Sequence, residues 1–428
     1  MRSNRKMKKD PEKLLTRIQL ILFVLFLFLW FISPNNPTLR TIGIGIFGAF
    51  SILQSMNIVK RKKLCIGKPI YLYILFAFWG VLSVLWAQDS NATLDRAFDL
   101  VCNVIFLIIS YDFFIHAKIN KATFISTFII VGLAFSIYIL SYYGISNYFS
   151  MLTSGRRVGR EIINVNFIGL ISTTTFILII YSVLNKIYSH KLMLLSAIIP
   201  LITALGSGSR KALIGLAIGS ILVFLFYMKG RMSRKKIVIS VLIVLAAILT
   251  INIIKTVPYF ETIFNRTKAM MTTLNDESTI TDQSTYTRKQ YIEEGLKTFL
   301  NHPITGIGLN NSGYITKEIS GQEAYLHCNY VELLACVGIV GFLLYYCIYL
   351  MILKKALKSS IKLPIIMIII LLIIEIGAVT YYEIKTTMHF ILILILLEKQ
   401  NWIHGTTREH IMVPAKLDGE TSEDVDKK

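Results

Sequence analysis

Arg210 stands at a place in the sequence that suits the binding of an anion. It follows the small-residue turn Gly-Ser-Gly-Ser at 206–209, and a long apolar run begins directly after it. The backbone N–H groups of such a turn, the positive N-terminus of the following helix and the guanidinium would converge on one ligand. The alternative interpretation is a plain tight turn whose arginine extends toward lipid headgroups.

A second basic segment carries Arg156, Arg157 and Arg160 among glycines, and Asn164 and Asn166 follow it. A guanidinium offers paired donors to phosphate oxygens, and each charge-assisted hydrogen bond contributes about 1.5–3 kcal/mol. The glycines allow the backbone to approach a ligand closely. The segment is therefore a second candidate diphosphate site, although such arginines also pair with acidic side chains or with lipid headgroups.

His327 lies where a long polar stretch gives way to an apolar run, and Asn329 and Tyr330 follow it as candidate supporting residues. An imidazole can take a proton from a sugar hydroxyl near neutral pH, whereas many interfacial histidines are only structural. Upstream, the sequence predicts an amphipathic helix over 287–300, which a Pro and Gly turn ends. Arg288 at the start of this helix is a further candidate to contact a phosphate.

Metal and redox chemistry find little support in the sequence. The five cysteines are odd in number and form no CxxC pair, so neither a disulfide framework nor a zinc site is indicated. The histidines other than His327 show no metal-ligand spacing. We therefore expect neither a metal nor a cofactor. Glu375 is an acid within an apolar run, where it would serve either a proton relay or a hydrogen bond between helices.

The composition excludes an ordinary soluble enzyme. Of the 428 residues, 54% are hydrophobic and 16% are charged, whereas soluble proteins are nearer a quarter charged. The formal net charge is +20. In a soluble chain that charge would suggest nucleic acid, but in a membrane protein it first indicates topology, so no nucleic acid is expected.

Apolar windows of the length needed to cross a bilayer recur along the chain. They predict an all-α polytopic membrane protein with about twelve transmembrane helices. The expected spans are 17–33, 39–59, 69–87, 95–115, 122–143, 165–185, 192–207, 210–228, 237–254, 327–353, 363–381 and 384–398. The last two are short, so they are also compatible with a hairpin that does not fully cross.

Every second connection between these spans is rich in Lys and Arg, which predicts that both termini face the cytoplasm in the cell membrane. The expected organisation is a basic N-terminus at 1–16, spans one to nine at 17–254, a large extracytoplasmic loop at 255–326, spans ten to twelve at 327–398 and a polar cytoplasmic tail at 399–428. The large loop favours an enzyme with a pocket at one membrane surface. A flippase or exporter for a lipid-linked sugar is the alternative, and it should show internal repeats, which this sequence lacks.

The order of motifs resembles the O-antigen ligase and polysaccharide polymerase family of bacterial membrane glycosyltransferases. The resembling part runs from about residue 86 to residue 344. Its motifs are Arg96 in the fourth span, Arg-x-x-Gly and Asn-x-Asn at 156–166, Gly-Ser-Arg at 208–210, Pro-Ile-Thr-Gly-Ile-Gly at 303–308, His327 with Asn329 and Tyr330, and Gly-Ile-Val-Gly at 338–341.

The resemblance implies a metal-independent transferase of the GT-C type that uses a polyprenyl-diphosphate sugar donor at the outer membrane face. It also implies roles for particular residues. The family's loop arginine matches Arg157 or Arg160, its second arginine matches Arg210, and its essential histidine matches His327. The chain departs from the family in having Asn-Val-Asn at 164–166, where Asn-Pro-Asn is frequent, and His-Cys-Asn at 327–329, where His-Asn is frequent.

The expected activity is that of a repeat-unit polymerase for a capsular, O-antigen or exopolysaccharide. It would transfer a glycan, with inversion, from an undecaprenyl-type diphosphate to a second lipid-linked sugar. Its partners would be the lipid-linked donor and acceptor, membrane lipids, and a chain-length regulator and a flippase of the same pathway. The first alternative is a ligase that transfers the glycan to a lipid, a wall polymer or a protein.

Overall fold

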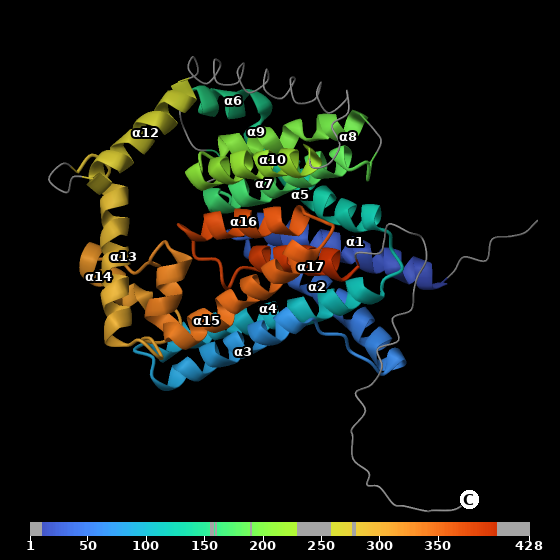
Figure 1. The fold of residues 1–428 in the computed structure, drawn as a ribbon, viewed down its shortest axis with the longest axis horizontal. Coiled ribbons are helices and arrows are strands. Elements are labelled where there is room, and N and C mark those ends of the chain that lie inside the picture. The colour runs from blue at the N-terminus through green and yellow to red at the C-terminus, as the bar shows by residue number, and fades with distance from the viewer. Residues whose placement is uncertain are drawn as a thin grey trace, which may run out of the picture.

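The computed structural model describes residues 11–154, 158, 161–188, 191–228, 258–275 and 280–399. Every regular element within these residues is a helix (Figure 1). The helices are α1 (Pro11–Ile32), α2 (Pro37–Arg61), α3 (Lys68–Leu82), α4 (Ser90–His116), α5 (Lys121–Tyr143), α6 (Ile145–Thr153), α7 (Val165–Leu184), α8 (Lys191–Ser196), α9 (Ile198–Gly206), α10 (Arg210–Met228), α12 (Pro258–Asn275), α13 (Gln283–Asn301), α14 (Ser312–Ser320), α15 (Asn329–Lys358), α16 (Leu363–Glu375) and α17 (Ile384–Glu398), with a 3₁₀ turn η1 (Ser83–Leu85) after α3.

Eight of these helices are long and apolar enough to cross a bilayer. They are α1, α2, α3 with η1, α4, α5, α7, α10 and α15, and each coincides with an expected span. Each supplies an apolar window of 18 residues, which rises about 27 Å at 1.5 Å per residue. The expected ninth span at 237–254 lies outside the described residues. The chain is therefore a polytopic membrane protein.

The expected span at 363–381 is cut short in the structure. α16 has 13 residues and ends at Glu375, and α17 is a separate helix of 15 residues. Every residue of α17 from Ile384 to Leu397 is buried, because α4, α15 and α16 pack around it. α17 is thus an interior helix of the bundle rather than a lipid-facing one.

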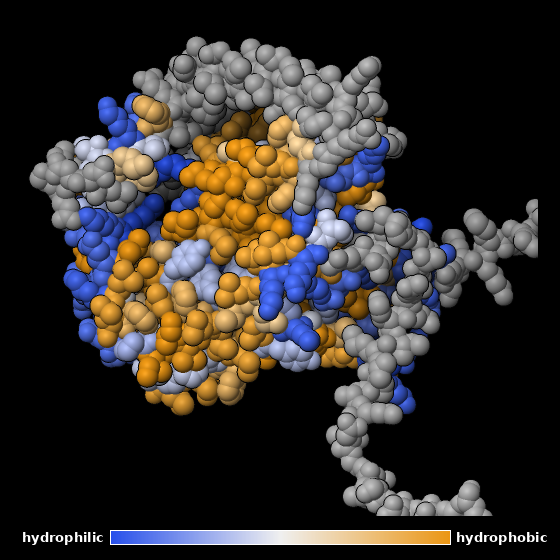
Figure 2. All heavy atoms as spheres, viewed as in Figure 1, coloured by the Kyte–Doolittle hydropathy of each residue, from blue (hydrophilic) through white to orange (hydrophobic). Residues whose placement is uncertain are grey.

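The outer surface of the bundle has the polarity of a membrane protein. Figure 2 shows hydrophobic residues over the middle of the visible face, with hydrophilic residues over α12 to α14 at one end and over the opposite end. Large apolar side chains such as Ile44, Phe98 and Ile130 are exposed on α2, α4 and α5. In a bilayer this exposure allows contact with lipid chains.

Polar side chains define several helix starts. Asp89 Oδ1 accepts from the N–H groups of Asn91 and Ala92 at the start of α4. Asp282 caps α13 in the same way. Such caps satisfy donors that a helix leaves open, and each typically contributes about 1 kcal/mol. The amphipathic helix expected over 287–300 is confirmed as α13, which ends at Asn301.

α15 is broken at Gly338, and the segment 303–308 fills the break. Gly338 has φ 64° and ψ −169°, and a Cβ there would lie 2.2 Å from the carbonyl oxygen of Ile304. The N–H of Ile307 donates to the carbonyl of Ala335 at 3.0 Å, so the segment satisfies a carbonyl that the break leaves open. The motifs at 303–308 and 338–341 therefore form one structural unit, which joins the C-terminal end of α13 to α15.

Glu375 takes part in hydrogen bonds between helices. Its carboxylate accepts from the hydroxyl groups of Tyr345, Tyr346, Tyr349 and Thr380 at 2.6–3.0 Å. Four donors satisfy a buried acid completely. Of the two interpretations of Glu375, the structure therefore supports the hydrogen bond between helices.

Candidate active site

The N-terminal end of α7 and the turn before α10 are joined by a side-chain hydrogen bond. Ser209 Oγ donates to Asn166 Oδ1 at 2.8 Å. Ser209 also caps α10, since its hydroxyl accepts from the N–H of Ala212. Asn164 caps α7 by accepting from the N–H of Asn166 at 2.9 Å. The Asn-x-Asn segment and the Gly-Ser-Arg segment therefore form one polar corner.

Small residues bring these elements close together. A Cβ at Gly169 would lie 2.2 Å from Ala212 Cβ, and one at Gly206 would lie 1.9 Å from Tyr148 Oη. Gly208 has φ 60°, which glycine adopts without strain. A larger side chain at Gly169 would push α7 from α10, and one at Gly206 would push α9 from Tyr148 of α6.

Arg210 is the first residue of α10 and is half-buried. The Nζ of its neighbour Lys211 donates to the carbonyl of Gly377 in the α16–α17 connection. The corner thus brings two basic residues to the N-terminus of a helix, an arrangement that favours anions. The other expected diphosphate ligands, Arg157 and Arg160, lie outside the described residues.

His327 lies between α14 and α15 in an unusual backbone conformation. Its φ of 60° places it in the left-handed region, which is uncommon for a residue with a side chain. Glu332, in the first turn of α15, holds the preceding peptide by accepting from the N–H of Leu326 at 2.8 Å. The same carboxylate accepts from Ser312 Oγ at 2.7 Å and so ties α14 to α15. The structure therefore fixes the backbone on the N-terminal side of His327.

Two tyrosine rings flank the imidazole. The ring centroid of Tyr325 lies 4.3 Å from that of His327. The ring of Tyr291, on α13, is parallel to the His327 imidazole with a centroid distance of 6.3 Å. Tyr325 Oη also accepts from Asn164 Nδ2 at 3.4 Å. This contact joins the His327 region to the polar corner of α7 and α10. The structure thus brings Asn164, Asn166 and the turn before Arg210 into one site with His327.

The surroundings of His327 favour its neutral form. Burial, followed by the positive charges of Arg288 and Lys211, lowers the pKa of His327 to about 4. Burial likewise raises the pKa of Tyr325. At neutral pH the imidazole is therefore uncharged and can accept a proton, while the cations beside it can attract an anionic ligand. Arg288 of α13, expected as a phosphate ligand, lies close enough to His327 to affect its charge.

A partly buried ion pair at the start of α17 was not expected from the sequence. Lys385 Nζ lies 2.6 Å from Glu383 Oε2, and the Lys385 side chain is only 6% exposed. The same ammonium lies 4.5 Å from the ring centroid of Phe167, in the first turn of α7. The sequence shows only a Glu-x-Lys pattern at 383–385, a few residues before the apolar run at 390–397. Burial beside α7 makes Lys385 a further cation close to the polar corner.

Arg96 of α4 forms a second polar cluster with the loop before α14. Its guanidinium donates to Asp99 at 2.8 Å and to Asn310 Oδ1 at 3.2 and 3.3 Å, and it lies 3.5 Å over the ring of Tyr382. This cluster fixes the α16–α17 connection against α4.

Asn329 and Tyr330, expected as supporting residues, form hydrogen bonds with α16 and with the segment that follows it. Asn329 Oδ1 accepts from the N–H of Thr380 at 2.9 Å, and its Nδ2 donates to Tyr346 Oη at 2.9 Å. Tyr330 Oη donates to the carbonyl of Leu372 at 3.1 Å. Their hydrogen bonds thus position the start of α15, directly after His327.

The side chains of this site are mainly basic groups and hydroxyl groups. Among the described residues, no group of three or more His, Cys, Asp or Glu side chains could hold a metal ion. The arrangement combines a neutral imidazole, several cations and a helix N-terminus, which together suit a substrate that carries a phosphate or diphosphate.

The fold and site define a multi-pass membrane protein with a basic polar site at one end of its helix bundle. A family model described as O-antigen ligase matches residues 195–346. The match confirms the resemblance to the O-antigen ligase family over that part of the chain, which includes Arg210, Arg288 and His327. It supports a function of the O-antigen ligase or polymerase type in general. No curated protein matches the chain.

Proposed function

We propose that the protein is a membrane glycosyltransferase that polymerises lipid-linked repeat units of a surface polysaccharide. The donor is a glycan on a polyprenyl diphosphate, and the acceptor is a sugar hydroxyl of a second lipid-linked unit. The observation that carries the proposal is the junction of the polar corner with the His327 region through Asn164 and Tyr325. This contact supports the proposal, because a helix start that binds the anion and a residue that accepts the proton would then share one site.

The arginines hold the leaving group. Arg210, Arg288 and one of Arg157 and Arg160 bind the diphosphate and neutralise the charge that develops as its bond to the anomeric carbon breaks. No metal ion is needed, since guanidinium groups supply the positive charge. Lys211 adds to the positive potential at the start of α10, whereas the charge of Lys385 is balanced by Glu383.

His327 takes the proton of the attacking hydroxyl. The acceptor oxygen forms the new bond to the anomeric carbon from the side opposite the diphosphate, and the diphosphate leaves with the electron pair of the old bond. The configuration at this carbon is therefore inverted. Binding of the anionic donor raises the low pKa of His327, because a nearby negative charge stabilises the imidazolium.

The proposal is tested with purified protein, lipid-diphosphate repeat units and no membrane potential. The protein should release polyprenyl diphosphate and lengthen the glycan. Movement of intact lipid across vesicles without glycan transfer would instead identify a flippase.

A ligase would use the same donor chemistry with another acceptor. The two activities are separated by the surface glycan of a deletion strain. Single repeat units on the surface indicate loss of a polymerase, whereas long chains left on polyprenyl diphosphate indicate loss of a ligase.

A further inference from the structure

A second polar site lies at the opposite end of the helix bundle. Asp112 lies near the end of α4, about 33 Å along the helix from Ser90 at 1.5 Å per residue. Ser90 belongs to the end of α4 that meets the loop before α14. The second site is therefore separated from the His327 site by the thickness of the bundle.

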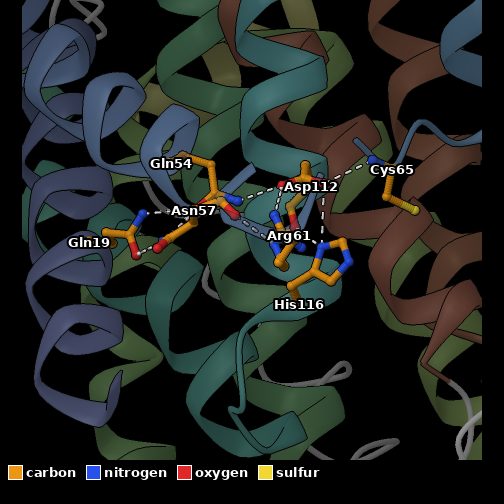
Figure 3. A network of polar contacts seen from close by, with 7 residues as sticks. All are labelled: Gln19, Gln54, Asn57, Arg61, Cys65, Asp112 and His116. Atoms are coloured by element: carbon orange, nitrogen blue, oxygen red, sulfur yellow. Dashed lines mark hydrogen bonds and ion pairs between the residues drawn. The ribbon is translucent and has the colours of Figure 1, made fainter. Parts of the chain in front are cut away.

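Buried amides connect Asp112 to α1 and α2 through a chain of hydrogen bonds (Figure 3). Gln19 of α1 donates to Gln54 of α2 at 2.9 Å, and Gln54 donates to Asp112 at 2.5 Å. Gln19 and Gln54 are each 2% exposed. Asn57 donates to Gln19 and lies one turn from Gln54. Burying such groups in a helix bundle is costly unless a structure or a ligand uses them.

Asp112 is saturated with donors and organises the surrounding cations. It accepts from Arg61 Nη2 at 2.6 Å and from the N–H of Cys65 at 2.9 Å, and His116 Nδ1 lies 3.3 Å away. Arg61 Nη1 has no hydrogen-bond partner within the part of the chain that the structure describes. The guanidinium thus keeps an unsatisfied donor beside the site.

A cavity of 910 Å³ opens beside these groups, between the ends of α1, α2, α4 and α5. Its basic and titratable lining residues are Lys13, Arg17, Lys60, Arg61, His116 and Lys118. Glu12 is the acidic lining residue, and it pairs with Lys118 at 3.0 Å. The lining therefore carries a clear excess of positive charge.

Apolar side chains line the same cavity. Leu15, Leu20 and Phe113 belong to it, on helices that continue into the membrane. An excess of basic loops on one side would by itself explain lysines at helix ends. It explains neither the cavity nor the buried amides beneath it.

We propose that this cavity binds the phosphate-bearing headgroup of an anionic membrane lipid. Basic pockets between transmembrane helices bind such headgroups, and each nearby Lys or Arg contributes about 1 kcal/mol. The cations face the phosphate, the partly exposed amide of Asn57 offers a hydrogen bond to the headgroup, and the apolar lining contacts the glycerol and acyl part. A free inorganic anion would use the cations but not the apolar wall.

The test uses the full-length protein in nanodiscs of phosphatidylcholine that contain phosphatidylglycerol. Bound phosphatidylglycerol is measured by native mass spectrometry after release from the nanodisc. The variant Arg17→Gln with Lys60→Gln removes two exposed cations of the lining and leaves the Arg61 to Asp112 pair intact. The loss of two cations should weaken retention roughly tenfold or more.

A matched control is Lys354→Gln with Lys358→Gln. These two lysines are exposed near the end of α15 and do not line the cavity. The control should retain phosphatidylglycerol as the unchanged protein does. Equal loss in both double variants would overturn the proposal, because it would show only a general attraction of basic surface to anionic lipid.

Two further arms distinguish other occupants. Inorganic phosphate alone should not displace the lipid at equal concentration, and full displacement would assign the cavity to a free anion. Conversion of Glu423, Asp424 and Asp426 to their amides in the full chain should leave lipid retention unchanged. A marked increase would show that the acidic end of the chain occupies the cavity, and the lipid proposal would be wrong.

Discussion

The amide of Asn164 and the phenol of Tyr325, 161 residues apart in the sequence, meet at 3.4 Å between Nδ2 and Oη. Asn164 caps α7, and the Tyr325 ring lies against the imidazole of His327. The contact therefore couples the helix start that faces the proposed diphosphate to the proposed proton acceptor.

The first prediction concerns this contact. Tyr325→Phe keeps the ring against His327 but removes the oxygen that Asn164 contacts. A neutral hydrogen bond contributes about 0.5–1.5 kcal/mol, so turnover should fall roughly 2- to 10-fold. Tyr325→Ala also removes the ring and should reduce turnover further. Equal turnover by all three proteins, measured as released polyprenyl diphosphate, would show that the contact is incidental.

The second prediction concerns His327 as the proton acceptor. His327→Ala should lose about 10²–10⁴-fold in glycan transfer, since that is the usual contribution of a general base. Donor binding should persist because the arginines remain, and it can be measured with a labelled lipid diphosphate. Normal transfer by this variant would remove His327 from the mechanism.

The third prediction concerns pH. The pKa of His327 in the empty site is lowered to about 4, so kcat/KM should stay level from neutral pH downward and fall only as the pH approaches 4. Arg288→Gln removes a positive charge that disfavours the imidazolium. It should therefore raise the pKa of His327 and move the acidic fall of kcat/KM to higher pH. A fall at unchanged or lower pH would contradict this assignment.

The fourth prediction concerns the geometry of Arg210. Arg210→Lys keeps the charge but replaces paired planar donors with a single ammonium, so most of the activity should be lost. Arg210→Ala should lose at least as much. Polymer at the normal level in cells carrying either variant would mean that Arg210 only extends toward lipid headgroups.

The fifth prediction concerns orientation. The alternation of basic connections in the sequence predicts that 255–326 faces the outside of the cell and that the basic stretch 229–236 faces the inside. A membrane-impermeant thiol reagent should therefore label Ser284→Cys in intact cells, and Ser233→Cys only after the cells are opened. Each variant is compared with its parent, whose native cysteines give the background. The reverse pattern would invert the protein and move the His327 site to the cytoplasmic side.

Much of the bundle followed from the sequence because apolar windows and basic connections depend on local composition. The eight long spans and α13 could be placed in this way. The interior position of α17 could not, since an apolar helix surrounded by protein and one surrounded by lipid have the same composition. The early end of α16 at Glu375 could not be predicted either. The tyrosines whose hydroxyl groups donate to this carboxylate lie on another helix, α15.

The candidate site shows the same division. Arg210, Arg288 and His327 could be selected from the sequence because cations and imidazoles near apolar runs break the local pattern. Lys385 was missed, since only its burial beside Phe167 and Glu383 distinguishes it from an ordinary lysine at a helix start.

By itself the sequence determined that this chain spans a membrane many times and which of its residues carry the cationic and imidazole groups of the candidate site. Hydrophobicity, charge and turn residues are properties of short segments, so they can be read without knowledge of the fold. Only the tertiary structure decided which segments meet. The contact of Asn164 with Tyr325, the filling of the α15 break by 303–308 and the low pKa of His327 all depend on residues far apart in the chain. The strength of each contact and the shift of this pKa depend on interatomic distances and on burial, and neither can be derived from one segment of the sequence.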